Sequence, residues 1–242
     1  MDKLLTQLVG KLQKAYGERL ISVVLYGSAV TGDHQADFSD INILCVLSEI
    51  STRELAAAGE IFRWWREQGS PSPLLLTEHE LVTSADCFAI EFHDIQRQHR
   101  LLHGKDLITP LRVEDTFYRA QVEHELRAKL LRVRQKAGGM LSNPDLLRRM
   151  LLDSVSTFCV LFRHALVLGG GSDAPILKRE VIRRASEAFG IDGTPFEKLL
   201  DVREGSLKPR ELDPVQLLGS YLKEISQVID ALDRIERIGE LS

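Results

Sequence analysis

The sequence predicts a two-domain protein of the α/β plus all-α class, with a small mixed β-sheet and flanking helices followed by a helical bundle. Short β-branched apolar runs alternate with helical patterns in the first part of the chain, and after Pro110 long helical patterns take over. A length of 242 residues fits two domains of modest size. We therefore expect one domain over residues 1–110 and a second over residues 111–242.

The first domain is expected to begin with an amphipathic helix over residues 2–16, because leucines recur there at helical spacing. The runs "LISVVLY" (20–26) and "INILCVL" (41–47) are short and rich in β-branched residues, which is typical of buried strands. A Ser-x-x-Glu capping box then predicts the start of a helix over residues 51–69, and a second, weaker box formed by Thr77 and Glu80 predicts a short helix.

Two further strands complete the predicted sheet. The run "LLLT" (74–77) follows a proline-rich loop and predicts the third strand. A fourth strand is expected in "CFAIEFHDI" (87–95), because Phe88, Ile90 and Phe92 would share one face of it. The polar segment "QRQHRLLHGKD" (96–106) is interpreted as a solvated helix end, with the basic wall of a phosphate site as the alternative.

Four helices are expected in the second domain, over residues 114–137, 145–168, 176–189 and 213–237. The glycine-rich segments "GGGSDAP" and "GIDGTP" are interpreted as loops. Helices in succession without strands between them favour a bundle. The apolar stretch "VSTFCVLFRHALVLGGG" contains an arginine and a histidine and is expected to be too short to span a bilayer.

Composition narrows the class of protein. Hydrophobic residues make up 44% of the chain and charged residues 27%, which is usual for a protein with a packed core. The net charge of −4 argues against general nucleic-acid binding. The charged N-terminus does not resemble a signal peptide, and the three cysteines lack metal-ligand spacing. We expect a protein of the cytoplasm with no membrane partner.

The stretch "LYGSAVTGDHQADFSDINILCVL" (25–47) carries the candidate chemistry. Gly27 permits a sharp turn after the strand and a close approach by a ligand, because glycine has no Cβ. Ser28 would then open a short helix, and the free N–H groups at a helix start suit a phosphate. Asp40 and Asn42 are two residues apart at the start of the next strand, so their side chains would project together. Two carboxylates in such positions chelate Mg²⁺.

This stretch resembles the signature of the nucleotidyltransferase superfamily with the DNA-polymerase-β-like fold, in which Gly-Ser is followed by a loop and then Asp-x-Asp on a strand. The two-domain layout is similar to that of the kanamycin-type nucleotidyltransferases. The resemblance implies that Gly27 and Ser28 bind the nucleotide phosphates and that Asp40 is the first metal carboxylate. Asn42 occupies the second metal position and departs from the family pattern.

The resemblance also implies a third carboxylate from a neighbouring strand, which would bind a second metal ion or take the proton of the nucleophile. Glu91 is the best candidate, with Asp94 behind it. Asp40 and Glu91 are therefore the candidate catalytic residues, and Asp40 with Asn42 the candidate metal ligands. The implied cofactor is Mg²⁺, and the implied substrate is a nucleoside triphosphate.

Two functions remain open. The chain could transfer a nucleoside monophosphate to a hydroxyl of a small molecule or protein acceptor. Alternatively, Asn42 could mark a degenerate site in a nucleotide-binding or regulatory module that acts through a protein partner. The acceptor is unknown, and a homodimer is left open. Residues 127–136 are strongly basic, which favours either a charged helix face or a surface for a triphosphate or an acidic partner.

Overall fold

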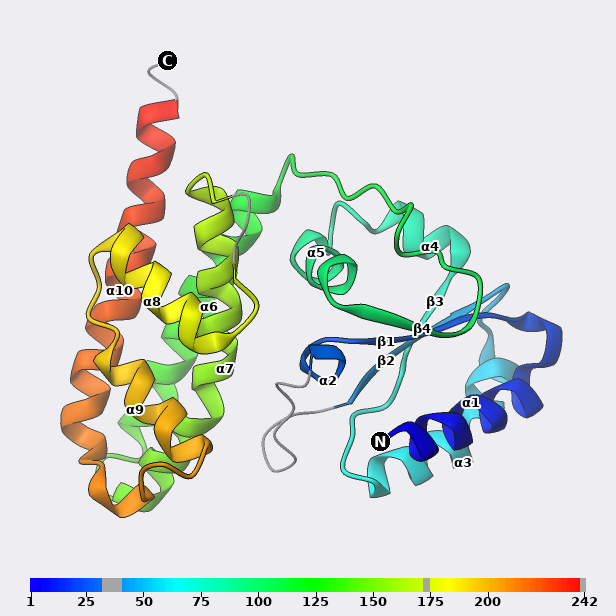
Figure 1. Cartoon of the computed structure of the whole chain (residues 1–242), viewed down its shortest axis with the longest axis horizontal. Coiled ribbons are helices and arrows are strands. Elements are labelled where there is room, and N and C mark those ends of the chain that lie inside the picture. Colours follow the sequence, from blue (N-terminus) through cyan, green and yellow to red (C-terminus); the bar gives the residue numbers. More distant parts are fainter. Residues whose placement is uncertain (32–40, 172–174, 240–242) are drawn as a thin grey trace. The chain divides into compact units, whose positions relative to one another are not determined.

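The computed structural model describes residues 1–31, 41–171 and 175–239 (Figure 1). The chain divides into two compact units, residues 1–118 and residues 119–242. The first unit contains a four-stranded mixed sheet with helices on both faces. The second unit is helical over its described residues. The predicted fold class is therefore confirmed.

The sheet has the strand order β3-β2-β1-β4. Its central pair is β1 (Leu20–Tyr26) and β2 (Asn42–Leu47), which run antiparallel. The edge strands are β3 (Leu74–Thr77), parallel to β2, and β4 (His99–Gly104), antiparallel to β1. Because strand side chains alternate between faces, β1 and β2 each contribute apolar residues to both sides of the sheet.

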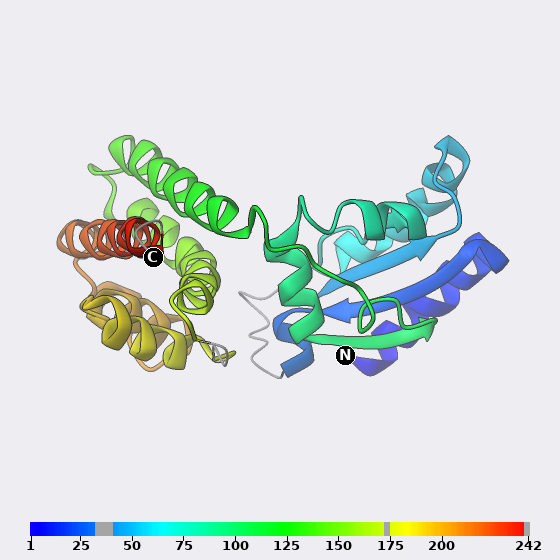
Figure 2. The same cartoon turned by 90° about the horizontal axis from the view of Figure 1, so that it is seen from above.

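Helices cover both faces of this sheet (Figures 1 and 2). One face packs against α1 (Asp2–Tyr16) and α3 (Thr52–Glu67), with Leu8 and Trp65 fully buried. The other face packs against α4 (Glu78–Thr83) and α5 (Ala89–Arg97). A short 3-10 turn, η1 (Gly17–Arg19), joins α1 to β1.

Both predicted capping boxes are present at the starts of α3 and α4. The Ser51 N–H donates to the Glu54 carboxylate at 3.1 Å, and the Thr77 N–H donates to the Glu80 carboxylate at 2.8 Å. Glu54 is buried and also pairs with Arg19 at 3.1 Å, so the cap is tied to the loop before β1. The hydrogen bonds of the two capping boxes thus fix where α3 and α4 begin, as the sequence indicated.

The prediction of a strand over residues 87–95 was wrong. This segment contains α5, and the fourth strand is β4, within the segment interpreted as a solvated helix end. Phe88 is 52% exposed, whereas Phe92 and Ile95 are buried at helical spacing. β4 is an edge strand with three polar residues in six, so it lacks the apolar alternation that identifies a strand.

The described helices of the second unit are α6 (Tyr118–Gly138), α7 (Pro144–Leu168), α8 (Lys178–Phe189), α9 (Thr194–Arg203) and α10 (Pro214–Gly239), with a short η2 (Pro209–Glu211). Their core contains clustered aromatic rings, with centroids 5.1 Å apart for Phe162 and Phe196 and 4.9 Å for Phe196 and Tyr221. The predicted helices correspond to α6, α7, α8 and α10. The sequence interpretation missed α9, a ten-residue helix that starts within the expected loop.

Helix α7 is longer and more apolar than expected. With 25 residues and a mean hydropathy of 1.6 in its most apolar window, it could cross a membrane by length and composition, so the prediction that this region is too short was wrong. Inside the unit, however, 61% of that window is buried, and Arg163 and His164 are buried with it. A helix that is apolar nearly all round is expected at the centre of a bundle.

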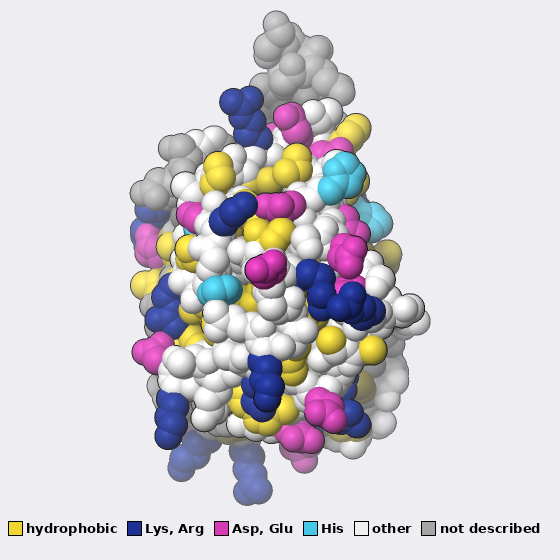
Figure 3. Space-filling view, turned by 90° about the vertical axis from the view of Figure 1, so that its right-hand side faces the viewer, with side chains coloured by type: hydrophobic (Ala, Val, Ile, Leu, Met, Phe, Trp, Pro, Cys, Tyr) yellow, Lys and Arg dark blue, Asp and Glu magenta, His cyan; other side chains and the backbone are white. Residues whose placement is uncertain are grey.

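Charged side chains are mixed on the face of the first unit that Figure 3 presents. Among its coloured atoms, lysine and arginine side chains alternate with aspartate and glutamate, and apolar side chains lie between them. Two ion pairs of this unit join Arg19 to Glu54 and Arg100 to Asp2. This mixture agrees with the small net charge of the chain.

Gly104 should be indispensable at the end of β4. Its φ is +80°, and a Cβ at this position would lie 1.9 Å from the Ile21 carbonyl oxygen. We expect Gly104→Ala to lower the free energy of unfolding, measured by urea denaturation, by about 3 kcal/mol or more. Gly10 in α1 is the matched control, because a Cβ there meets nothing within 4 Å. Gly10→Ala should raise stability by about 0.5–1 kcal/mol, and equal effects of the two substitutions would contradict this assignment.

Candidate functional site

Gly27 forms the turn at the end of β1. Its φ is +79°, a conformation that favours glycine. Its N–H donates to the Gln98 carbonyl at 3.1 Å, and its own carbonyl accepts from the Val30 N–H at 3.0 Å. The short helix α2 (Ser28–Thr31) starts at the next residue. The predicted sequence of strand, glycine turn and helix start is therefore present.

Asn42 lies beside this turn. It is the first residue of β2 and is the antiparallel partner of Tyr26, the last residue of β1. A Cβ built on Gly27 would lie 3.4 Å from the Asn42 side-chain nitrogen. The turn after β1 and the start of β2 thus meet at the same end of the two central strands. There the Asn42 carboxamide adjoins the Gly27 backbone.

Tyr26, Asn42 and His99 form one row across three strands. Tyr26 pairs with Asn42 on β2 and with His99 on β4. Directly opposed residues of antiparallel strands point to the same face of a sheet. This is the face that α4 and α5 cover, because Tyr26 packs with the cluster that contains Leu81 and Phe92.

Glu91 belongs to the first turn of α5 and not to a strand. Burial raises the pKa of the Tyr26 hydroxyl above its ordinary value of 10, and the negative charge of Glu91 raises it further. Helix α5 packs on the face of the sheet that carries Tyr26 and Asn42, so Glu91 lies on the same side of the sheet as Asn42. Asp94 follows about one helical turn later in α5 and is half-buried.

Asp40 lies outside the residues that the structure describes, as do Asp33 and Asp37. Over residues 1–31, 41–171 and 175–239, no group of three or more His, Cys, Asp or Glu side chains is arranged to hold a metal ion. The described candidates near the turn are the neutral carbonyl oxygen of Asn42 and the Glu91 carboxylate. The role of Asp40 as a metal ligand therefore stays a prediction.

The sequence interpretation did not select Tyr26 or His99. His99 is the first residue of β4, and its ring Nδ1 donates back to the Ile95 carbonyl of α5 at 3.0 Å. Its place in the row depends on the pairing of β1 with β4, which the sequence interpretation did not identify. Tyr26 had a clear signal, because it directly precedes the Gly-Ser turn.

Comparisons with known proteins find one matching family model and similar solved structures. Residues 5–96 match the family model described as the nucleotidyltransferase domain. Among solved structures, the chain is similar to a spectinomycin adenyltransferase from Enterococcus faecialis, with a TM-score of 0.54 and 15% sequence identity over 96% of this chain and 98% of that one. That crystal structure contains ATP and spectinomycin. No match was found among curated proteins.

At this level of identity the structural likeness shows a shared fold that extends over both units. The family match covers the turn after β1, the start of β2 and helix α5. It therefore includes Gly27, Ser28, Asn42 and Glu91. The first unit of this chain thus matches the nucleotidyltransferase domain model over most of its length, residues 5–96.

Proposed function

We propose that this chain moves a nucleoside monophosphate from a nucleoside triphosphate to a hydroxyl group of a small molecule. The main support is that the Gly27 turn adjoins Asn42 within the matched domain. Further support is the shared fold with an adenyltransferase whose structure contains ATP and spectinomycin. A fold alone does not identify an acceptor, so the acceptor is proposed only as a hydroxyl-bearing small molecule.

The turn after β1 would hold the phosphates of the nucleotide. The Gly27 N–H already donates to the Gln98 carbonyl, so the contribution of Gly27 would be the absence of a Cβ that could obstruct a phosphate. The Ser28 hydroxyl would donate to a phosphate oxygen, since it begins the short helix α2. Both residues come from the end of a buried central strand, which fixes their position.

Asp40 and Asn42 would hold Mg²⁺ together with the phosphates. The ion, when bound, neutralises the charge that develops on the transferred group and on the leaving pyrophosphate. Asn42 offers one neutral carbonyl oxygen, and Mg²⁺ prefers anionic oxygen. The residues near the turn therefore fit a weak metal site, and Asp40 would supply most of its protein charge.

Glu91 would act as the general base. Its carboxylate would take the proton from the acceptor hydroxyl as that oxygen forms a bond to the α-phosphorus. The bond from the α-phosphorus to the bridging oxygen then breaks, and pyrophosphate leaves with the bonding electrons. The exposure of Glu91 at the start of α5 is compatible with access by an acceptor.

A second candidate function follows from Asn42 alone. If the missing charge prevents metal binding, the domain would bind a nucleotide without turning it over and would act through a partner. Loss of one carboxylate next to a divalent ion weakens its binding by an amount on the order of a few kcal/mol. The measurement of metal affinity therefore distinguishes the two functions.

Binding of ATP should depend on Mg²⁺ and on Asp40. In titration calorimetry with and without Mg²⁺, we expect Asp40→Ala to weaken the Mg²⁺-dependent binding of ATP by about tenfold or more. Asn42→Asp should strengthen it by about tenfold or more, because it restores an anionic ligand. Asp2→Ala is the control, since it removes an exposed carboxylate that pairs with Arg100.

The same titrations separate the two functions. Mg²⁺-dependent binding by the unmodified chain supports the transferase. Mg²⁺-dependent binding that appears only in Asn42→Asp supports the degenerate module. If the unmodified chain binds ATP in an Mg²⁺-dependent way, unchanged affinity in Asp40→Ala would overturn the proposed metal site.

Removal of the Glu91 charge should slow the chemical step. We expect Glu91→Gln to lower kcat by about 10²–10⁴-fold with little change in KM for ATP. The assay is pyrophosphate release in the presence of Mg²⁺ and a panel of hydroxylated small molecules that includes spectinomycin. Glu78→Gln, which alters an exposed glutamate in the first turn of α4, should leave the rate unchanged. Equal kcat values for the two variants would show that Glu91 is not the general base.

The proximity of Glu91 to Tyr26 can be tested without an acceptor. Because the Glu91 charge raises the pKa of the Tyr26 hydroxyl, Glu91→Gln should lower that pKa toward the value that burial alone sets. The tyrosine ¹³Cζ signal in an NMR pH titration reports it, and Glu78→Gln provides the comparison. An unchanged Tyr26 pKa in Glu91→Gln would show that the two side chains are far apart.

A further inference from the structure

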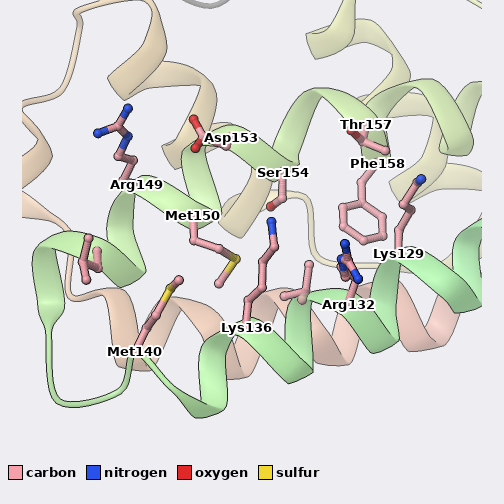
Figure 4. Close-up of a pocket in the computed structure, with 12 residues that line it drawn as sticks. Lys129, Arg132, Lys136, Met140, Arg149, Met150, Asp153, Ser154, Thr157 and Phe158 are labelled. Atoms are coloured by element: carbon pink, nitrogen blue, oxygen red, sulfur yellow. The ribbon is translucent and has the colours of Figure 1, made fainter.

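A pocket lies between α6 and α7, wholly within the helical unit (Figure 4). Its volume is about 460 Å³, which falls in the range of pockets that hold small molecules. Four basic side chains line it, three from α6 and one from α7: Lys129, Arg132, Lys136 and Arg149. The pocket uses none of the residues assigned to nucleotidyl transfer.

The basic side chains of this pocket are poorly neutralised. Lys129 pairs with Glu125 at 3.2 Å, but Arg132, Lys136 and Arg149 make no hydrogen bond or ion pair among the described residues. Asp153 is the single carboxylate among the residues that line the pocket. The lining therefore carries a net positive charge although the whole chain is acidic.

Other arginines of the same unit have acidic partners. Arg127 donates to Asp233 at 2.8 Å, and Arg179 donates to Asp201 at 2.7 Å. These pairs show how the unit satisfies a guanidinium when an acidic side chain is within reach. Arg132, Lys136 and Arg149 lack such a partner among the described residues, so each can accept an anion from solution.

The three basic residues of α6 lie on one side of that helix, because they are spaced three and four residues apart. Between the helices the pocket has an apolar floor made by Val133, Met150 and Phe158, all buried. In Figure 4, Lys136 reaches from α6 toward Ser154 of α7, while Met140 and Met150 lie toward one end and Phe158 toward the other. A cationic rim above an apolar floor suits a ligand that is anionic at one end and apolar at the other.

We propose that this pocket binds a small organic phosphate. The phosphate group would contact Arg132 and Lys136, because a guanidinium matches phosphate geometry with two parallel hydrogen bonds and an ammonium adds a point charge. The apolar or aromatic part of the ligand would pack on Val133, Met150 and Phe158. The pocket volume of about 460 Å³ favours a small molecule over a segment of polypeptide. This inference does not depend on the proposed nucleotidyl transfer.

Calorimetry on the full chain tests the chemistry of the ligand, with 1-naphthyl phosphate as the probe. We expect 1-naphthyl phosphate to bind at least about tenfold more tightly than inorganic phosphate or 1-naphthol, because only it uses both the cations and the apolar floor. Equal binding of inorganic phosphate and 1-naphthyl phosphate would overturn the proposed role of the floor. No binding of 1-naphthyl phosphate would overturn the site.

Variants test the residues that would contact the phosphate. Arg132→Gln and Lys136→Gln should each weaken the binding of 1-naphthyl phosphate by about tenfold. Both side chains are exposed, so neither substitution should disturb the core, and circular dichroism checks this. Lys198→Gln is the matched control, because Lys198 is an exposed lysine of α9 outside the pocket. Equal affinity in all three variants would overturn the proposal.

Methionine methyl signals test the location of the ligand. The chain has three methionines, of which Met140 and Met150 line the pocket and Met1 belongs to the first unit. With ¹³C-methyl methionine in the full chain, 1-naphthyl phosphate should shift the Met140 and Met150 signals and leave Met1 unchanged. A shift confined to Met1, or no shift at saturating probe, would contradict binding in this pocket.

Discussion

The candidate site depends on the antiparallel pairing of β1 with β2. This pairing sets Tyr26 opposite Asn42, so the glycine turn that ends one strand adjoins the first residue of the other. The two strands are buried on both faces, between α1 and α3 on one side and α4 and α5 on the other. A shift of the register by one residue would turn Asn42 to the opposite face and separate it from Glu91. The apolar packing of the strands therefore fixes the polar geometry at their ends.

Sequence patterns predicted those elements whose signals are local. The bounds predicted for β1 and β3 are those observed, and the capping boxes of α3 and α4 are present, because side-chain capping and β-branched runs act over a few residues. The edge strand β4 was missed because its place is determined by backbone pairing with β1 and its side chains are half polar. Without that pairing, the apolar alternation before it was assigned to a strand that does not exist.

The site shows the same division between local and long-range information. Gly27 could be selected from sequence because a turn with positive φ favours glycine, and the structure has that turn. The row of Tyr26, Asn42 and His99 could not, since it joins residues that are distant along the chain and requires the register of three strands. Glu91 was selected through a mistaken strand, and its role as a base stays a prediction. The pocket of the helical unit likewise depends on the packing of α6 against α7.

In the proposed function, the turn after β1 and the start of β2 together hold a metal-bound triphosphate. Paramagnetic relaxation by the Mn²⁺ complex of ATP measures this directly, because it broadens NMR signals close to the ion. The account predicts strong broadening of the Ser28 backbone amide and the Asn42 carboxamide, with the Thr77 amide on the edge strand β3 much less affected. Uniform broadening of all three signals, or none at saturating complex, would contradict it.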